Sequence, residues 1–138
     1  MRTQLFFDLV GETRHISVHF CEPHQMNEVR NDLLGCDIAL FEIVGTQLSS
    51  QEAVFKAFAI ALKMPAGWYG DEEYATNVNA FLEYLDDVVE WVPAKGHVVV
   101  IRDSEQFWRA EPRLAGDIVE WWQLATYRQA TIHLVFVW

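Results

Sequence analysis

Residues 37–44 read Asp-Ile-Ala-Leu-Phe-Glu-Ile-Val, a nearly continuous apolar run rich in β-branched and aromatic side chains. A short run of this kind without alternation is typical of a strand that is buried on both faces. His97–Ile101 and Thr131–Trp138 are two further runs of the same type. Strands buried on both faces belong mostly to parallel sheets, so the sequence predicts an α/β protein.

Helical patterns lie between these runs and are expected near residues 49–62, 77–91, 103–108 and 112–125. Ser49 and Ser50 are N-cap candidates for the first helix. Asp103 is a cap candidate for the third, and Pro112 opens the fourth. The resulting order β-α-α-β-α-α-β favours a parallel sheet with right-handed crossovers.

The N-terminal residues 1–36 have a different pattern. Gln4–Val10 and His15–Cys21 are rich in residues that favour strands, and a short polar segment separates them. This pattern predicts a β-hairpin that extends the same sheet or covers one of its edges. Pro23 then opens a short helix that runs through Leu34.

Length and composition indicate one globular domain over residues 1–138, with an extension over 1–36 and a core over 37–138. The chain is 51% hydrophobic and 22% charged. Its formal net charge of −10 argues against nucleic-acid and anionic-membrane partners and favours a basic partner. Cys21 and Cys36 form no disulfide framework, and no targeting segment is visible, so we expect a cytoplasmic protein.

The segment Gly-Trp-Tyr-Gly-Asp-Glu-Glu at residues 67–73 opens a strongly acidic region. Seven carboxylates and no Lys or Arg occur between Asp71 and Glu90. On a helical wheel of residues 77–91, the apolar side chains gather on one side. The opposite side carries Asn79, Glu83, Asp86, Asp87 and Glu90.

Large aromatic side chains beside a surface of one charge are typical of a protein interface rather than an active site. Trp68 and Tyr69 supply the aromatic rings, and Asp71, Glu72 and Glu73 follow them directly. Acidic side chains at helical spacing can imitate a row of phosphates and pair with the cations of a nuclease. The pattern therefore predicts a surface that binds and blocks a basic site.

Two segments and the order of elements from Ile38 to Trp138 resemble the barstar family of ribonuclease inhibitors. The first segment is Met-Pro-Ala-Gly-Trp-Tyr-Gly at residues 64–70, and the second is Asn-Val-Asn-Ala-Phe-Leu-Glu at residues 77–83. The resemblance implies an α/β fold with a three-stranded parallel sheet and helices, here extended by the N-terminal hairpin. It also implies that the loop and the second helix plug a ribonuclease active site.

By this resemblance, Glu83 falls at the family's central acid, Asn79 at another acidic contact, and Glu120 or Gln123 near an acid of the fourth helix. The partner-binding residues that we expect are Trp68, Tyr69, Gly70, Asp71, Glu72, Glu73, Asn77, Asn79, Glu83, Asp86, Asp87 and Glu120. The neutral Asn79 and the inserted residues 71–76 fit a relative with a different nuclease or toxin as its target.

The expected function is thus an inhibitor or immunity protein that binds a basic ribonuclease or nuclease toxin domain one to one. It is expected to be a monomer when free, with no catalytic residue, cofactor, metal, nucleic acid or membrane. Three alternatives remain open: a binding or regulatory module for a non-nuclease protein, a small enzyme that uses the acidic loop, and a metal site. The metal site would use His15, His19, Cys21 and His24.

Overall fold

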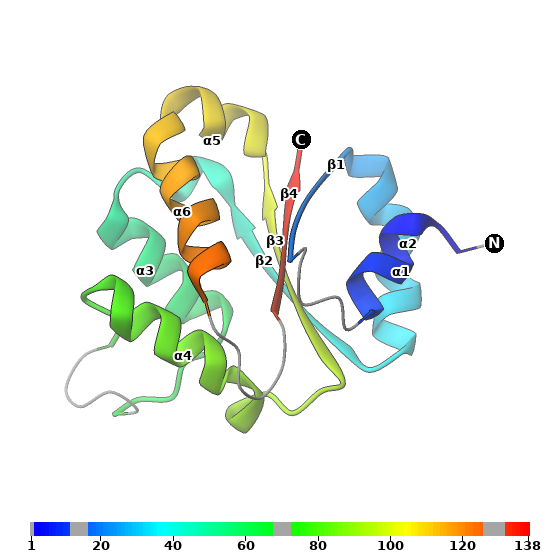
Figure 1. Ribbon diagram of the computed structural model, residues 1–138, viewed down its shortest axis with the longest axis horizontal. Helices are drawn as coiled ribbons and strands as arrows, with labels where there is room; N and C mark the ends of the chain where they lie inside the picture. Colours follow the sequence, from blue (N-terminus) through cyan, green and yellow to red (C-terminus); the bar gives the residue numbers. More distant parts are fainter. Residues whose placement is uncertain (1, 12–16, 68–72, 126–131) are drawn as a thin grey trace.

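The computed structural model describes residues 2–11, 17–67, 73–125 and 132–138 and contains one four-stranded sheet. The strands are β1 (Val18–Cys21), β2 (Ile38–Val44), β3 (Gly96–Arg102) and β4 (Ile132–Val137). All neighbours pair in parallel, in the order β1-β4-β3-β2. The α/β class with a parallel sheet is confirmed, but the sheet has four strands rather than three (Figure 1).

The helices lie on both sides of this sheet (Figure 1). They are α1 (Gln4–Val10), α2 (Pro23–Gly35), α3 (Gln51–Ala61), α4 (Val78–Trp91), α5 (Ser104–Ala110) and α6 (Pro112–Leu124), with a 3₁₀ turn η1 (Gly45–Gln47) after β2. The Ser50 hydroxyl accepts a hydrogen bond from the Ala53 amide, which confirms Ser50 as an N-cap. Asp103 precedes α5, but its side chain makes no capping hydrogen bond and its backbone is left-handed. Within the described residues, no helix combines the length and apolarity of a membrane span.

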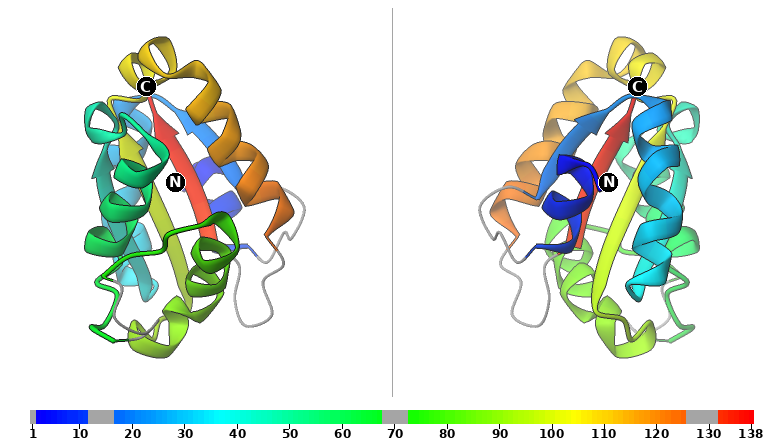
Figure 2. Two further views of the ribbon diagram at one scale, coloured as in Figure 1. Left: turned by 90° about the vertical axis from the view of Figure 1, so that its left-hand side faces the viewer. Right: turned by 90° about the vertical axis from the view of Figure 1, so that its right-hand side faces the viewer.

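One face of the sheet is covered by α3, α4, α5 and α6 (Figure 2). Strand residues Phe41, Val99 and Phe136 point into this layer and pack against its buried helix side chains. The Trp122 indole Nε1 donates a hydrogen bond to the carbonyl of Ile132 at 2.8 Å, which ties α6 to the start of β4. This layer therefore fixes the position of α4 relative to the sheet.

The other face of the sheet is covered by α1 and α2, which the N-terminal region supplies (Figures 1 and 2). Phe6 and Leu33 from these helices are buried with Val98 and Val135 of the central strands. The central strands β3 and β4 are thus apolar on both faces. Helices α1 and α2 therefore form part of the hydrophobic core and are not a peripheral addition to it.

The predicted N-terminal hairpin is wrong, because Gln4–Val10 forms helix α1. The Thr3 hydroxyl accepts a hydrogen bond from the Phe6 amide and caps the helix. Phe6 and Leu9 are both buried, at the spacing of three that places side chains on one helical face. In the described part of the second predicted strand, Val18–Cys21 is extended, and it pairs in parallel with β4 rather than with Gln4–Val10.

A pair of buried histidines joins β1 to β4 on the face covered by the N-terminal region. The Nε2 atom of His19 lies 2.9 Å from the Nδ1 atom of His133. A hydrogen bond with the Gly11 backbone also acts on His133. Both bonds are satisfied when His19 donates to Nδ1 of His133 and His133 donates to the carbonyl of Gly11, an arrangement that requires a neutral His133 ring.

The pKa values of both histidines are lowered, and burial is the main cause. Burial, followed by the charge of His19, lowers the pKa of His133 to about 4, against the raising effects of Gly11 and Asp8. Burial likewise lowers the pKa of His19, although Asp8 acts in the opposite direction. The unfolded chain therefore binds these protons more readily than the folded chain does.

This difference predicts that the histidine pair destabilises the fold in acid. The contribution is absent above pH 6.5, the ordinary pKa of histidine, and grows as the pH falls toward 4. It reaches about 3 kcal/mol for His133. Urea unfolding between pH 4 and pH 7 is expected to show a smaller pH slope for His133→Gln than for the original chain. His24→Gln, at an exposed position, is the control, and equal slopes for all three proteins would refute the prediction.

Candidate functional site

Asn77, which the sequence assigned to the partner-binding surface, immediately precedes helix α4 and is its N-cap. The Asn77 side-chain oxygen accepts a hydrogen bond from the Ala80 amide at 2.8 Å. This is an N-cap interaction, which satisfies one of the amide groups left free at the start of a helix. Although Asn77 is exposed, its oxygen already has a structural role in placing the first turn of α4.

Aromatic contacts hold α4 against its neighbours. The Phe81 ring lies 5.1 Å from Phe55 and 5.2 Å from Phe58 of α3, measured between centroids. It also lies 5.8 Å from the ring of Trp121 in α6. Near the other end of α4, the indole Nε1 of Trp91 donates a hydrogen bond to the carbonyl of Leu62 at 2.8 Å. The helix is therefore anchored at both ends and presents a rigid outer surface.

That outer surface carries an acidic stripe, which we define as Asn79, Glu83, Asp87 and Glu90. These four residues lie within about 80° of one another around the helix axis. Asn79, Glu83 and Glu90 are exposed, and Asp87 is half-buried. Within the described residues, Glu83 makes no ion pair. Helix α4 contains no Lys or Arg, so the stripe has a single sign of charge.

Asp86 differs from the residues of the acidic stripe in its burial, although the helical wheel grouped it with them. Its exposed fraction is 6%. Asp86 lies about 200° around the helix from Val88, so it points away from the side that packs against the sheet. A helical wheel describes only the side of a helix that packs on the core, so it could not predict that Asp86 is buried.

The remaining predicted residues flank α4. Glu73 is exposed and lies four residues before Asn77. Glu120 is exposed on α6, the helix whose Trp121 contacts Phe81 of α4. The other predicted residues lie outside the described part of the chain: Trp68, Tyr69, Gly70, Asp71 and Glu72.

A small polar network beside Glu73 was not predicted from the sequence. The Tyr74 hydroxyl donates a hydrogen bond to the Glu52 carboxylate at 2.8 Å. The Lys56 ammonium lies 3.4 Å from the same carboxylate and 5.2 Å from the centroid of the Tyr74 ring. The hydrogen bond from Tyr74, followed by the contact with Lys56, lowers the pKa of Glu52. The network fixes Tyr74 against α3; the spacing Glu52–Lys56 is its only local sequence signal.

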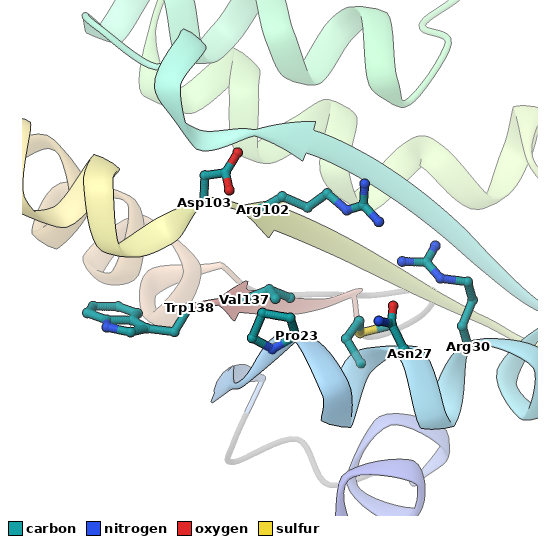
Figure 3. Close-up of a pocket in the computed structure, with 8 residues that line it drawn as sticks. Pro23, Asn27, Arg30, Arg102, Asp103, Val137 and Trp138 are labelled. Atoms are coloured by element: carbon teal, nitrogen blue, oxygen red, sulfur yellow. The ribbon is translucent and has the colours of Figure 1, made fainter.

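A separate cavity lies at the carboxyl ends of β3 and β4, beside the start of α2 (Figure 3). Its volume is about 220 Å³. Arg30 and Arg102 approach each other there from α2 and β3 (Figure 3). Glu42 of β2 pairs with both guanidinium groups, at 3.5 Å in the case of Arg102. The two ion pairs of Glu42 therefore connect α2, β2 and β3 beside this cavity.

The metal site considered from the sequence does not assemble among the residues that can be examined. His19 is paired with His133. His24 is exposed on α2, and His15 lies outside the described residues. Burial raises the pKa of the Cys21 thiol to about 11, which disfavours the thiolate that binds metals. Within the described part of the chain, no group of three or more His, Cys, Asp or Glu side chains is arranged to hold a metal ion.

Comparisons with known proteins agree with the resemblance seen in the sequence. Residues 38–137 match the family model described as Barstar (barnase inhibitor). No curated protein matches the chain. Among solved structures, a chain from "Structure of Drosophila ORC bound to DNA" is similar in fold, with a TM-score of 0.64 and 11% identity. The similarity covers 98% of the present chain but 36% of the Drosophila chain, and at this identity it concerns the fold alone.

The capping role of Asn77 leads to a prediction about stability. Asn77→Ala is expected to lower the free energy of unfolding by about 1 kcal/mol, because the Ala80 amide loses its acceptor. Asn77→Asp keeps the acceptor and is expected to remain close to the original chain. The matched control is Asn79→Ala, two residues on and exposed. Chemical denaturation measures all three; an equal loss for Asn77→Ala and Asn79→Ala would contradict the capping role.

Proposed function

This chain belongs to the barstar family, and from that premise we propose that it inhibits a basic ribonuclease or nuclease toxin. In this proposal α4 and the segment before it occupy the active site of the target, one molecule to one. The chain acts by binding rather than by catalysis and uses no cofactor. The family match spans 38–137 and so includes α4 and the strands β2, β3 and β4, but not β1.

The observation that carries the proposal is the acidic stripe on α4. A nuclease holds the phosphates of its substrate with Lys, Arg and His side chains, and a row of carboxylates offers the same charge. Helix α4 contains no Lys or Arg, and within the described residues the exposed Glu83 carboxylate makes no ion pair. Negative charge of this kind favours a basic partner. Charge of this kind speeds association and selects the partner.

The rigid support of α4 strengthens the proposal. Association costs free energy when side chains and segments must become ordered at the interface. The N-cap at Asn77 and the hydrogen bond from Trp91 to Leu62 already fix both ends of the helix. The stripe is therefore presented to a partner in one arrangement, and little of the helix has to be ordered on binding.

An enzymatic use of the same acids is less well supported. Paired carboxylates act as general acid and base when a cleft encloses them and shifts their pKa values apart. Glu83 and Glu90 are instead exposed on the convex outer surface of a helix. The geometry suits a flat contact with another protein better than it suits a bound substrate.

Affinity capture from the source cells, with elution by a salt gradient, tests the proposed partner. A basic nuclease that elutes only at high salt, and whose activity falls when the chain is added, supports the proposal. A non-nuclease protein captured through α4 would replace it with the binding-module alternative. Capture that does not respond to salt would exclude the acidic stripe as the main contact.

A matched pair of variants tests the stripe itself. Glu83→Ala is expected to weaken binding to the captured nuclease by at least thirtyfold, the lower end of about 2–5 kcal/mol for a paired interface charge. That general range draws in part on the barnase–barstar pair, the prototype of this family. Glu28→Ala removes an exposed acid from α2, on the opposite face of the sheet, and is expected to have no effect. Titration calorimetry measures both; equal affinities would remove α4 from the interface.

A further inference from the structure

Helix α3 ends in an unusual way at Lys63. The amide of Lys63 donates a hydrogen bond to the carbonyl of Ile60, and the amide of Met64 donates one to the carbonyl of Ala59. These two bonds form a Schellman motif with Lys63 at the left-handed position, where its φ is 56°. Glycine usually occupies this position because it has no Cβ atom to clash with the backbone.

The side chain of Lys63 therefore carries a cost in the fold. A left-handed residue other than glycine is disfavoured because its Cβ atom crowds the following carbonyl oxygen, and short polar residues such as Asp and Asn tolerate this backbone best. The other two such residues in the described part of the chain, Asp37 and Asp103, follow that rule. Lys63 does not follow it. Strain of this kind is often retained at binding sites, where the side chain has a use that glycine cannot supply.

A cavity lies directly beside Lys63. Its volume is about 320 Å³, which is within the range of pockets that bind side chains or small molecules. It is lined by Lys56, Ala59, Ile60, Lys63, Met64, Glu73 and Tyr74. Ile60 is 79% exposed, more than any other exposed large hydrophobic residue that the structure describes. The cavity thus combines an open apolar wall with a polar rim.

Two lysine side chains, Lys56 and Lys63, lie at the rim of this cavity, although the protein as a whole is acidic. Lys56 and Lys63 are two of the three lysines of a chain whose net charge is −10. The Glu52 carboxylate and the Tyr74 ring hold Lys56 in place. Within the described residues Lys63 makes no ion pair, so its ammonium is available to a partner. The charge at Lys63 is complementary to a carboxylate rather than to a second cation.

We propose that this cavity binds a segment of the inhibited nuclease in which an apolar side chain stands next to a carboxylate. The apolar side chain packs on Ile60 and Met64, and the carboxylate pairs with Lys63. The inference rests on the proposed function, because Glu73 lines the cavity and lies four residues before the cap of α4. The cavity and the acidic stripe then form one continuous interface with two opposite charges.

Two variants of α3 test this inference on the captured nuclease. Lys63→Gly removes the ammonium and relieves the left-handed strain, so affinity is expected to fall about fivefold while the thermal midpoint stays equal or rises. Ile60→Asp removes the apolar contact and repels the partner's carboxylate, and an affinity loss of roughly tenfold or more is expected. Leu34→Asp is the matched control, at a 54% exposed position of α2 on the opposite face.

A photo-reactive residue identifies what occupies the cavity. Ile60→benzoylphenylalanine, introduced into the full chain in the source cells, is expected to cross-link a nuclease segment that contains an apolar residue beside Asp or Glu. The same replacement at Leu34 is the control. A cross-link to a second copy of the chain, or to a protein that is not a nuclease, would overturn the inference.

The outcomes separate this inference from the proposed function. If Glu83→Ala weakens binding while Lys63→Gly and Ile60→Asp do not, the inhibitor function stands and the cavity is not part of the interface. If the two α3 variants weaken binding while Glu83→Ala does not, the cavity binds the partner and α4 has been wrongly assigned. If the intact chain captures no nuclease, both proposals fail.

Discussion

The strands β3 and β4 are apolar on both faces, and strands of this kind are stable only when other elements cover both sides of the sheet. Helices α3–α6 cover one face, and α1 and α2 cover the other. The position of α4 follows from this requirement, because its apolar side must pack inward, which leaves Asn79 and Glu83 exposed on the outer side. The packing of α4 on the sheet thus determines which of its side chains form the surface proposed for binding.

The fold could be predicted from the sequence wherever local patterns decide it. The apolar runs gave the strands β2, β3 and β4, and Ser50 and Pro112 marked helix starts correctly. The pattern failed at Gln4–Val10, where aromatic residues suggested a strand while the spacing of Phe6 and Leu9 belonged to a helix. A strand within His15–Cys21 was expected, and Val18–Cys21 is one. Its parallel pairing with β4 could not be foreseen, because β4 lies at the far end of the sequence.

The candidate site likewise has some features that the sequence predicted and others that it could not predict. The helical period places Asn79, Glu83 and Glu90 on the outer side of α4, and the structure has them exposed there. Asp86 shares that side in a simple wheel but is buried, because burial depends on every neighbouring segment and not on the sheet alone. Lys63 left no signal in the sequence, since its left-handed backbone and its cavity arise from the way α3 ends.

The pairing of β1 with β4 has a consequence for the order of events at the ribosome. Within the described residues β1 pairs with β4 alone, so the sheet face that α1 and α2 cover is incomplete until residues 132–137 have been synthesised. Until then Phe6, Met26 and Leu33, all buried in the finished protein, have no complete surface to pack on. Contacts between such distant segments form slowly, and exposed apolar surface invites aggregation in the meantime. The packing of α1 and α2 therefore depends on the strand that is synthesised last.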